Sequence, residues 1–454
     1  MNFISPSPST SLFCSLRPFD ELKLDPKNAR KHSPNQVRQI ARSIQSFGFN
    51  VPILIDKVGK ILAGHGRYLA AQQLALTEVP VIQLEHLSPE QARAFAIADN
   101  KLTENASWDD ALLGEIFAEL ATLELNFDLE VTGFSMGEID LHIQGVTLDT
   151  QKSDPVDTVQ PSVPAQKAVT QMGDLWELGD HRILCGNSLE ASSYEILMEG
   201  RQAGVVFTDS PFNVPIDHHV VGNGKTQHRE FAMASGEMST AEFTQFLQTV
   251  MEHLAANSSN GSIHYLCMDW RHLSEILSAG SKVYTELKNL CVWVKDKGGM
   301  GSLYRSQHEL VLVYKNGTAA HRNNVELGKY GRYRTNVWNY PGANTLSRQG
   351  TEGNLLAMHP TVKPIALVTD ALLDCSARGD LVLDSFLGSG TTLLAAHRVG
   401  RICYGLEIDP LYVDTSIRRW QSMTGQSAKL KRTGQSFDEL QSLLVNDSME
   451  ANHD

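Results

Sequence analysis

The sequence lacks the features of a secreted, membrane-bound or metal-dependent protein. Its six cysteines are dispersed over 454 residues without a C-x-x-C pair, and its histidines show no zinc spacing. No apolar run approaches the roughly 20 residues that a membrane span needs, and the start has no signal-peptide pattern. We therefore expect a cytoplasmic protein with reduced thiols, no membrane partner and no metal.

Positive charge is scarce as well. The net charge of −13 excludes a uniformly basic nucleic-acid binder, although it allows a local basic face. No internal repeat of solenoid length is present, so an array of repeats is excluded. The length of 454 residues suggests about two or three domains, and a hydrophobic content of 42% is enough for their cores.

Changes of composition along the chain indicate where these domains begin and end. Residues 1–16 are rich in Ser and Pro and are predicted to be loose. Residues 146–172 contain several prolines and no apolar periodicity, which is typical of a linker. We predict folded units at 17–145 and 173–421, followed by a polar tail at 422–454.

A glycine turn is the most informative part of the first unit. Gly64, His65, Gly66 and Arg67 lie between a predicted strand and a predicted helix. A helix N-terminus with an adjacent cation favours phosphate groups. The alternative is that the glycines only form a turn and that Arg67 makes a surface ion pair; the residues alone leave both interpretations open.

The first unit resembles the N-terminal domain of ParB-like proteins. The similar segments are the opening that ends in Asn-Ala-Arg, ILAGHGRYLAA and AFAIADNKLTE. The resemblance implies a small α+β domain, of the kind shared with sulfiredoxins, and a nucleotide or phosphate at Gly64, Gly66 and Arg67. Sulfiredoxins have a reactive Cys in this turn, whereas this chain has His65, so that chemistry is not expected. Residues 17–42 are mildly basic, which is either a DNA-facing or a merely solvated surface.

In the second unit, Gly379–Asp409 has the pattern strand, glycine-rich loop, helix, strand. Asp384 follows the first apolar run, and Glu407 ends the second strand. Ligands of parallel α/β sheets bind outside the carboxyl ends of the strands, and an acidic residue there accepts bonds from ribose hydroxyls. The spacing is neither G-x-G-x-x-G nor a phosphate loop. We interpret it as the site of a nucleoside-containing cofactor, with a structural turn as the alternative.

A second motif, Asp209-Ser210-Pro211-Phe212, directly follows a buried strand. A carboxylate held there accepts a hydrogen bond from an exocyclic amino group, and the next carbonyl accepts a second one. The two bonds direct the nitrogen lone pair toward an electrophile, and Phe212 can stack on a base. An Asp-Ser-Pro turn without such a function is the alternative.

Together the two motifs resemble those of β-class amino-methylating DNA methyltransferases, D-x-F-x-G-S-G-T-T and Asp/Asn/Ser-Pro-Pro-Tyr/Phe/Trp. The resemblance implies a Rossmann-like α/β domain whose sheet is mostly parallel with an antiparallel edge hairpin. It also implies S-adenosyl-L-methionine (SAM) as the cofactor, with Lys363 at its methionine carboxylate and Asn187 near its adenine. The implied cofactor residues are Asp384, Phe386, Gly388, Ser389, Gly390, Thr391, Thr392, Glu407, Lys363 and Asn187.

The implied function is methylation of the exocyclic amino group of a flipped base by a site-specific enzyme, as in restriction–modification. Asp209 favours adenine N6, and cytosine N4 is the alternative. No Pro-Cys dipeptide is present, so attack on cytosine C5 has no candidate. Ser210 for Pro and Asn187 for Asp depart from the family pattern, and Ser210 loses the fixed φ of proline. A third reading is therefore a ParB-like regulatory protein with a degenerate methyltransferase domain.

The charge pattern favours double-stranded DNA as the substrate. Residues 282–350 contain eleven basic and four acidic side chains with interleaved aromatic residues. This composition suits phosphate contacts and base stacking, and the resemblance implies target recognition at about 296–358. The sequence leaves open the recognition site, a restriction partner and a homodimer. The residues that we expect to contact DNA are Lys295, Arg305, Arg332 and Arg334.

Overall fold

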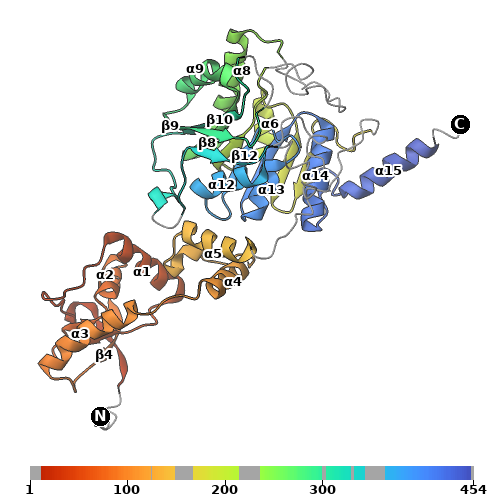
Figure 1. Ribbon diagram of the computed structural model, residues 1–454. Helices are drawn as coiled ribbons and strands as arrows, with labels where there is room; N and C mark the ends of the chain where they lie inside the picture. The colour runs from red at the N-terminus through yellow and green to blue at the C-terminus, as the bar shows by residue number, and fades with distance from the viewer. Residues whose placement is uncertain are drawn as a thin grey trace. The chain divides into compact units, whose positions relative to one another are not determined.

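The computed structural model divides the chain into two units, residues 1–149 and 150–454, each with its own sheet and core (Figure 1). The residues that the structure describes are 12–123, 125–148, 167–213, 236–298, 303–328, 332–342 and 363–450.

The first unit is built on a four-stranded sheet of mixed direction. The strand order is β1 (Cys14–Pro18), β4 (Glu78–Gln83), β2 (Ile53–Ile55) and β3 (Ile61–Ala63). Only the central β4–β2 pair is parallel. The α-helices of this unit are α1 (Pro34–Phe47), α2 (His65–Gln73), α3 (Pro89–Glu104), α4 (Asp110–Leu120) and α5 (Met136–Leu148).

Local signals set the ends of α1. The Ser33 hydroxyl accepts a hydrogen bond from the Gln36 amide at 3.2 Å, and Gly48 ends the helix with a φ of +87°. Helix α2 begins three residues earlier than the sequence predicts, because Gly64 is its N-cap in the left-handed conformation. The prediction that residues 1–16 are loose is wrong for the start of β1, which pairs with β4; residues 1–11 lie outside the described residues.

The second unit has a ten-stranded sheet. Its central strands β8, β7, β12, β13 and β6 run parallel, and β9 and β10 form an antiparallel hairpin near one edge. The predicted α/β fold class is therefore confirmed. In spatial order the strands are β11 (Val337–Asn339), β9 (Glu286–Val294), β10 (His308–Lys315), β8 (Ser258–Met268), β7 (Ala203–Thr208), β12 (Leu381–Asp384), β13 (Ile402–Glu407), β6 (His181–Cys185), β5 (Leu175–Leu178) and β14 (Lys429–Leu430).

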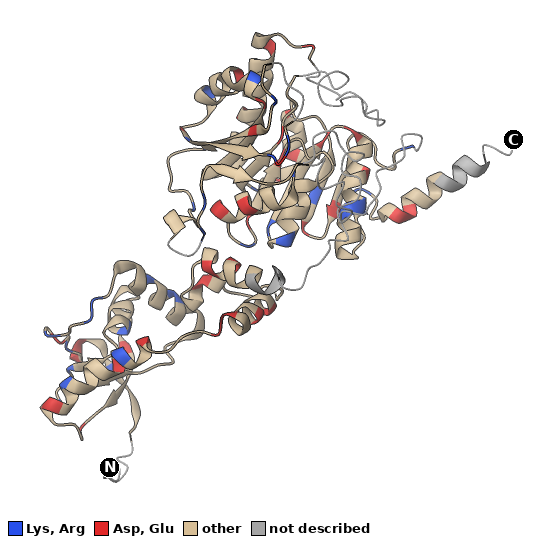
Figure 2. Ribbon diagram, in the orientation of Figure 1, with Lys and Arg blue, Asp and Glu red and all other residues tan. Residues whose placement is uncertain are grey.

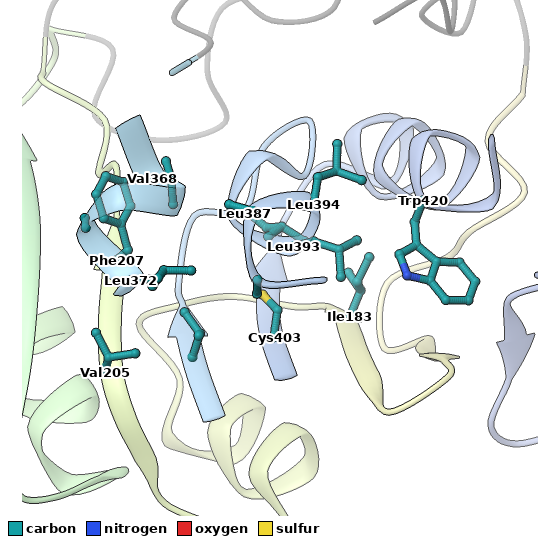
Figure 3. Close-up of a cluster of buried hydrophobic side chains, with 14 of the residues drawn as sticks. Ile183, Val205, Phe207, Val368, Leu372, Leu387, Leu393, Leu394, Cys403 and Trp420 are labelled. Atoms are coloured by element: carbon teal, nitrogen blue, oxygen red, sulfur yellow. The ribbon is translucent and has the colours of Figure 1, made fainter. Parts of the chain in front are cut away.

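Helices cover both faces of this sheet. Successive side chains of a strand point to opposite faces, so Val205 and Phe207 join one apolar cluster while Val206 joins the other. Figure 3 shows the first cluster, in which Leu394 and Trp420 lie over the strands. The helices are α12 (Ile365–Cys375), α13 (Thr391–Arg398) and α14 (Pro410–Thr424) on the first face, and α6 (Ala191–Met198), α8 (Thr240–Ala256) and α9 (Leu273–Val283) on the second.

The predicted polar tail belongs to the fold, which corrects the boundary at residue 422. Strand β14 pairs antiparallel with β5, and Phe437 at the start of α15 (Phe437–Glu450) is fully buried against Trp176, with ring centroids 5.4 Å apart. The apolar residues that anchor the segment are too few and too widely spaced to give a periodic pattern in the sequence.

Candidate active site

Two neighbouring parallel strands bring the two sequence motifs together. Strand β7 pairs with β12, and their carboxyl ends lead to Asp209 and Asp384. The Thr208 hydroxyl donates a hydrogen bond to Asp384 Oδ1 at 2.8 Å. Motifs that are separated by most of the unit in sequence therefore meet at one edge of the sheet.

The glycine-rich loop between β12 and α13 is held in shape by α14. Gly390, the N-cap of α13, has a φ of +87°, and a Cβ there would lie 2.8 Å from Ser416 Oγ. Ser416 Oγ donates to the Gly388 carbonyl at 2.9 Å, and Arg419 Nη1 donates to the Ser389 carbonyl at 2.7 Å. The sequence analysis missed Ser416 and Arg419, because single polar residues on an amphipathic helix carry no local signal.

Two buried carboxylates flank this loop. Glu407 accepts hydrogen bonds from the Gly388 amide and the Asp409 amide, both at 2.8 Å, and burial raises its pKa to about 7. Burial also raises the pKa of Asp384 to about 6, although the Phe386 amide donates to Asp384 Oδ1 at 3.0 Å. Each carboxylate oxygen has two lone pairs, so Glu407 and Asp384 can accept further bonds from hydroxyl groups.

The remaining residues predicted for the cofactor lie at the same edge of the sheet. The Gly186 amide, at the end of β6, donates to the Glu407 carbonyl at 3.0 Å, which places the following Asn187 beside β13. Asn187 Oδ1 accepts from the Leu189 amide at 3.0 Å. The structure thus gathers the predicted set along three strand ends. The members that are buried in the loop or in the first turn of α13 are Gly388, Ser389, Gly390, Thr391 and Thr392.

Lys363 is the exception to this grouping. Its Nζ donates to Asp209 Oδ2 at 2.5 Å and lies 2.9 Å from Glu309 Oε2. The structure therefore gives Lys363 carboxylate partners of this chain, rather than the free position that a cofactor carboxylate would need. Glu309 was not identified from the sequence, because a lone Glu in an apolar strand does not reveal its partners. Residues 359–362, just before Lys363, lie outside the described residues.

Asp209 has one oxygen that is engaged and one that is not. Oδ2 binds Lys363, whereas Oδ1 is buried without a hydrogen-bond partner among the described residues. Burial raises the pKa of Asp209, and Lys363 opposes that rise. A buried acceptor with no donor is costly, so Oδ1 is suited to a donor from a ligand.

The loop after Asp209 is more strongly fixed than the missing proline suggests. Ser210 is 5% exposed, Pro211 follows it, and Phe212 packs against both apolar clusters. Asn213 has a φ of +54°, and its side chain accepts from the Met238 amide at 3.2 Å and donates to the Met238 carbonyl at 2.8 Å. Asn213 therefore restrains the loop, which reduces the loss from Ser210.

Two of the predicted DNA contacts have another role. Arg332 is 6% exposed and donates to Asp374 Oδ1 at 2.6 Å. Arg334 donates to Asp374 Oδ2 at 3.0 Å and to the Tyr340 hydroxyl at 2.9 Å. These bonds tie the chain after β10 to α12, so we correct the assignment of Arg332 and Arg334 from DNA phosphates to internal ion pairs.

The other two predicted contacts differ from each other. Lys295 Nζ pairs with Glu309 Oε1 at 2.5 Å and lies 4.7 Å from the centre of the Trp293 ring. Arg305 is exposed and stays a predicted DNA contact. Figure 2 shows both signs of charge interspersed over the helices of this unit.

The glycine turn of the first unit also has unpaired polar atoms. His65 Nε2 and Arg67 Nε are buried without a partner among the described residues. Burial lowers the pKa of both side chains. The Arg67 guanidinium lies against Gly64, where a Cβ would come within 2.9 Å of it.

In the described part of the chain, no group of three or more His, Cys, Asp or Glu residues could hold a metal, and no helix could cross a bilayer.

Three family models match consecutive parts of the chain. The ParB N-terminal domain matches residues 15–101, and a ParB-methyltransferase HTH domain matches residues 111–172. A DNA methylase model of the N6/N4 type matches residues 203–418. The HTH match includes the segment that we interpret as a linker, of which residues 149–166 lie outside the described residues. The class is therefore a ParB-type N-terminal domain followed by an N6/N4 DNA methylase domain.

Individual relatives match the two parts separately. The ParB-like nuclease domain-containing protein YnaK of Escherichia coli is 51% identical over 75 residues, which are 16% of this chain and 86% of that protein. The type II methyltransferase M.ScaI of Streptomyces caespitosus is 33% identical over 98 residues, 22% of this chain and 32% of that enzyme. The structure of an M1.HpyAVI–SAM complex is similar at 19% identity and a TM-score of 0.39, covering 52% of this chain and 97% of that one.

The chain belongs to the ParB-like proteins, and it joins that domain to a DNA methylase domain of the N6/N4 family.

Proposed function

We propose that the protein transfers a methyl group from SAM to the exocyclic amino group of a DNA base, and that this group is adenine N6. The observation that carries the proposal is the buried, unpaired Oδ1 of Asp209 at a strand end beside the glycine-rich loop. The match to the DNA methylase model supports the reaction class and the DNA substrate.

The proposed cofactor site consists of the residues at the ends of β12, β13 and β6. Glu407 accepts ribose hydroxyls in addition to its two backbone bonds, and Gly388, which has no Cβ, lets the ligand approach the backbone of the loop. Asn187 supplies amide groups for the edge of the adenine ring. The cofactor itself provides an electrophilic methyl group. The SAM named with the M1.HpyAVI structure agrees with this choice.

The proposed target site lies at Asp209–Phe212. Asp209 Oδ1 accepts one N–H of the amino group, and the Ser210 carbonyl accepts the other. These two bonds localise the nitrogen lone pair, so the contribution of the protein is mainly positioning and electrostatics. Lys363 lies 5.4 Å from the centre of the Phe212 ring, and the flipped base stacks on the opposite face of that ring.

Replacement of Asp209 tests the target site. We expect Asp209→Ala to lower the methylation rate by about 1,000-fold or more, because the reacting nitrogen loses its acceptor, while SAM binding measured by calorimetry is retained. Asp438→Ala, at an exposed position of α15, is the matched control and should leave both unchanged. Full methylation by Asp209→Ala would refute the assigned role.

The identity of the base is tested by nucleoside mass spectrometry after reaction with DNA. We expect N6-methyladenine, because Asp at the first motif position is more typical of adenine-specific enzymes. Finding only N4-methylcytosine would contradict the adenine assignment and leave the methyltransferase assignment intact. If the protein is instead a ParB-like regulatory protein with a degenerate methyltransferase domain, it should bind SAM without methylating DNA. A Ser210→Pro variant should then not restore methylation.

The first unit supports a second candidate activity, the binding of a nucleotide phosphate at Gly64, Gly66 and Arg67. The supporting observation is that His65 Nε2 and Arg67 Nε are buried without partners at the start of α2. The unpaired Arg67 donor at a helix N-terminus suits an anionic ligand.

A further inference from the structure

Four charged side chains form a connected, partly buried cluster beside the target site. Lys363 Nζ lies 2.5 Å from Asp209 Oδ2 and 2.9 Å from Glu309 Oε2, and Lys295 Nζ lies 2.5 Å from Glu309 Oε1. The side chains of Lys363 and Glu309 are 4% and 12% exposed. Two positive and two negative charges therefore balance, with Glu309 shared between the two lysines.

Aromatic rings complete the surroundings of the lysines. Lys363 lies 5.4 Å from the ring centre of Phe212 and 5.8 Å from that of Trp293, and Lys295 lies 4.7 Å from that of Trp293. Burial disfavours the ionised form of Glu309, yet Lys363 and Lys295 hold its pKa at about 2. Glu309, the second residue of β10, is thus ionised near neutral pH and lies beside Lys295, which directly follows β9, and beside Lys363.

We propose that Glu309 is a positioning residue for methyl transfer, which keeps Lys363 on Oδ2 of Asp209 and so leaves Oδ1 free for the amino group of the target base. The proposal rests on the proposed function and adds to it a residue outside both motifs. A lysine ammonium has three donors, so without Glu309 the buried Lys363 would turn a second donor toward Oδ1 of Asp209. It would then compete with the base for Oδ1.

Charge balance gives a second reason. Loss of the Glu309 carboxylate leaves the cluster with a net charge of +1, and an unpaired buried charge is costly. Asp209 faces Lys363, Glu309 and Lys295, and among the described residues Cys267 and Asp384 also interact with it electrostatically. Burial raises the pKa of Cys267 well above its usual value, so this thiol stays neutral.

The test is Glu309→Gln, compared with Glu286→Gln in β9 of the same hairpin, whose carboxylate makes a more exposed ion pair with Lys288 at 3.0 Å. We expect Glu309→Gln to lower kcat about 100-fold with little change in KM for DNA, because the acceptor is misplaced. The control should retain the wild-type kcat.

The pH profile separates positioning from general damage. Glu309 raises the pKa of Asp209 and Lys295 lowers it. The acid limb of kcat should therefore move to lower pH in Glu309→Gln and to higher pH in Lys295→Gln, and Glu309→Asp should restore it toward the wild-type position. Asp384 is present in every variant, so the differences between them belong to the cluster.

Two results would overturn the proposal: wild-type kcat with an unchanged acid limb in Glu309→Gln, or limbs that move in the same direction in both variants. If Glu309→Gln does not fold, the acid limb of kcat in Lys295→Gln is the deciding measurement. A limb that moves to lower pH or stays in place would contradict the proposed coupling of the cluster to Asp209. An absence of methylated base with the wild-type protein would instead refute the proposed function itself.

Discussion

Each unit starts a short helix after a glycine in the left-handed conformation, but the side chains around the two turns differ in charge. Gly64 precedes α2 with a φ of +99°, and Gly390 precedes α13 with a φ of +87°. Around Gly390, the carboxylates of Asp384 and Glu407 occupy the strand ends. At Gly64, the adjacent side chains are those of His65 and Arg67, and each has a buried nitrogen without a partner among the described residues.

The difference indicates what each turn can bind. A helix N-terminus alone attracts anions. Acidic neighbours change that preference toward hydroxyl groups and cations, which fits a nucleoside that carries a sulfonium. Basic neighbours reinforce it, which fits a phosphate. We propose that the same backbone conformation suits two ligand chemistries, and that the side chains of the adjacent strand ends and helix decide between them.

The largest effect is expected when a Cβ is added at Gly390, where α14 packs closely against the second turn. Gly390→Ala adds a Cβ 2.8 Å from Ser416 Oγ at a positive φ. We expect the second unit to lose about 3 kcal/mol of unfolding free energy in urea titrations, from left-handed strain plus overlap. Gly425→Ala is the matched control: its φ is +69° with open space around it, so it should cost about 1 kcal/mol. Equal losses would show that space at Gly390 is irrelevant.

A smaller effect is expected when the acidic character of this turn is reduced. Glu407→Gln should weaken SAM binding about tenfold at pH 8, because hydrogen bonds to a charged acceptor are stronger than those to an amide. Burial raises the pKa of Glu407 to about 7, above its ordinary value of 4.5. SAM affinity of the wild-type protein should therefore rise as the pH increases through 7, when the carboxylate ionises.

The variant should keep only the dependence near pH 6 that belongs to Asp384. The sign is opposite for stability. A raised carboxyl pKa contributes stability below pH 4.5, and that contribution is lost as the pH rises toward 7. Calorimetric titrations from pH 5 to 9 measure the first effect. An unchanged pH profile in Glu407→Gln would exclude Glu407 as the ionising acceptor.

An effect of the same size, on a different ligand, is expected at the first turn. Arg67→Ala should weaken the binding of a nucleoside triphosphate to the full chain about tenfold, through loss of one charge-assisted contact, and leave SAM binding unchanged. Arg93→Ala, which removes an exposed partner of Glu90 on α3, is the control. If both variants bind the nucleotide equally well, the basic turn has no ligand role and the comparison fails on that side.

Local patterns in the sequence were sufficient for much of the fold. Ser33 and Gly48 mark the ends of α1, and the apolar runs before Asp209 and Asp384 predict β7 and β12. Because parallel strands share a carboxyl edge, the meeting of the two motifs could also be predicted.

Contacts between distant segments could not be predicted. The role of Glu309 depends on two partners that are distant in sequence. The pairing of β9 with β10 brings Lys295 to it, and the chain before α12 brings Lys363. Arg332 and Arg334 looked like DNA contacts in a basic stretch, but their acidic partner Asp374 lies on a helix that reads as core. Composition counts charges and does not reveal which of them are already paired.

The ten-stranded sheet ends on both sides in very short strands, β11 with three residues and β14 with two. Few unpaired backbone groups are therefore exposed to another chain, and this protects a large sheet from edge-to-edge aggregation. On the β14 side, this protection depends on the pairing of Lys429 with Glu177, which is separated from it in sequence by most of the unit. Pairing between segments so distant in sequence is slow to form, so the β5 edge stays open to other chains until β14 has paired with it.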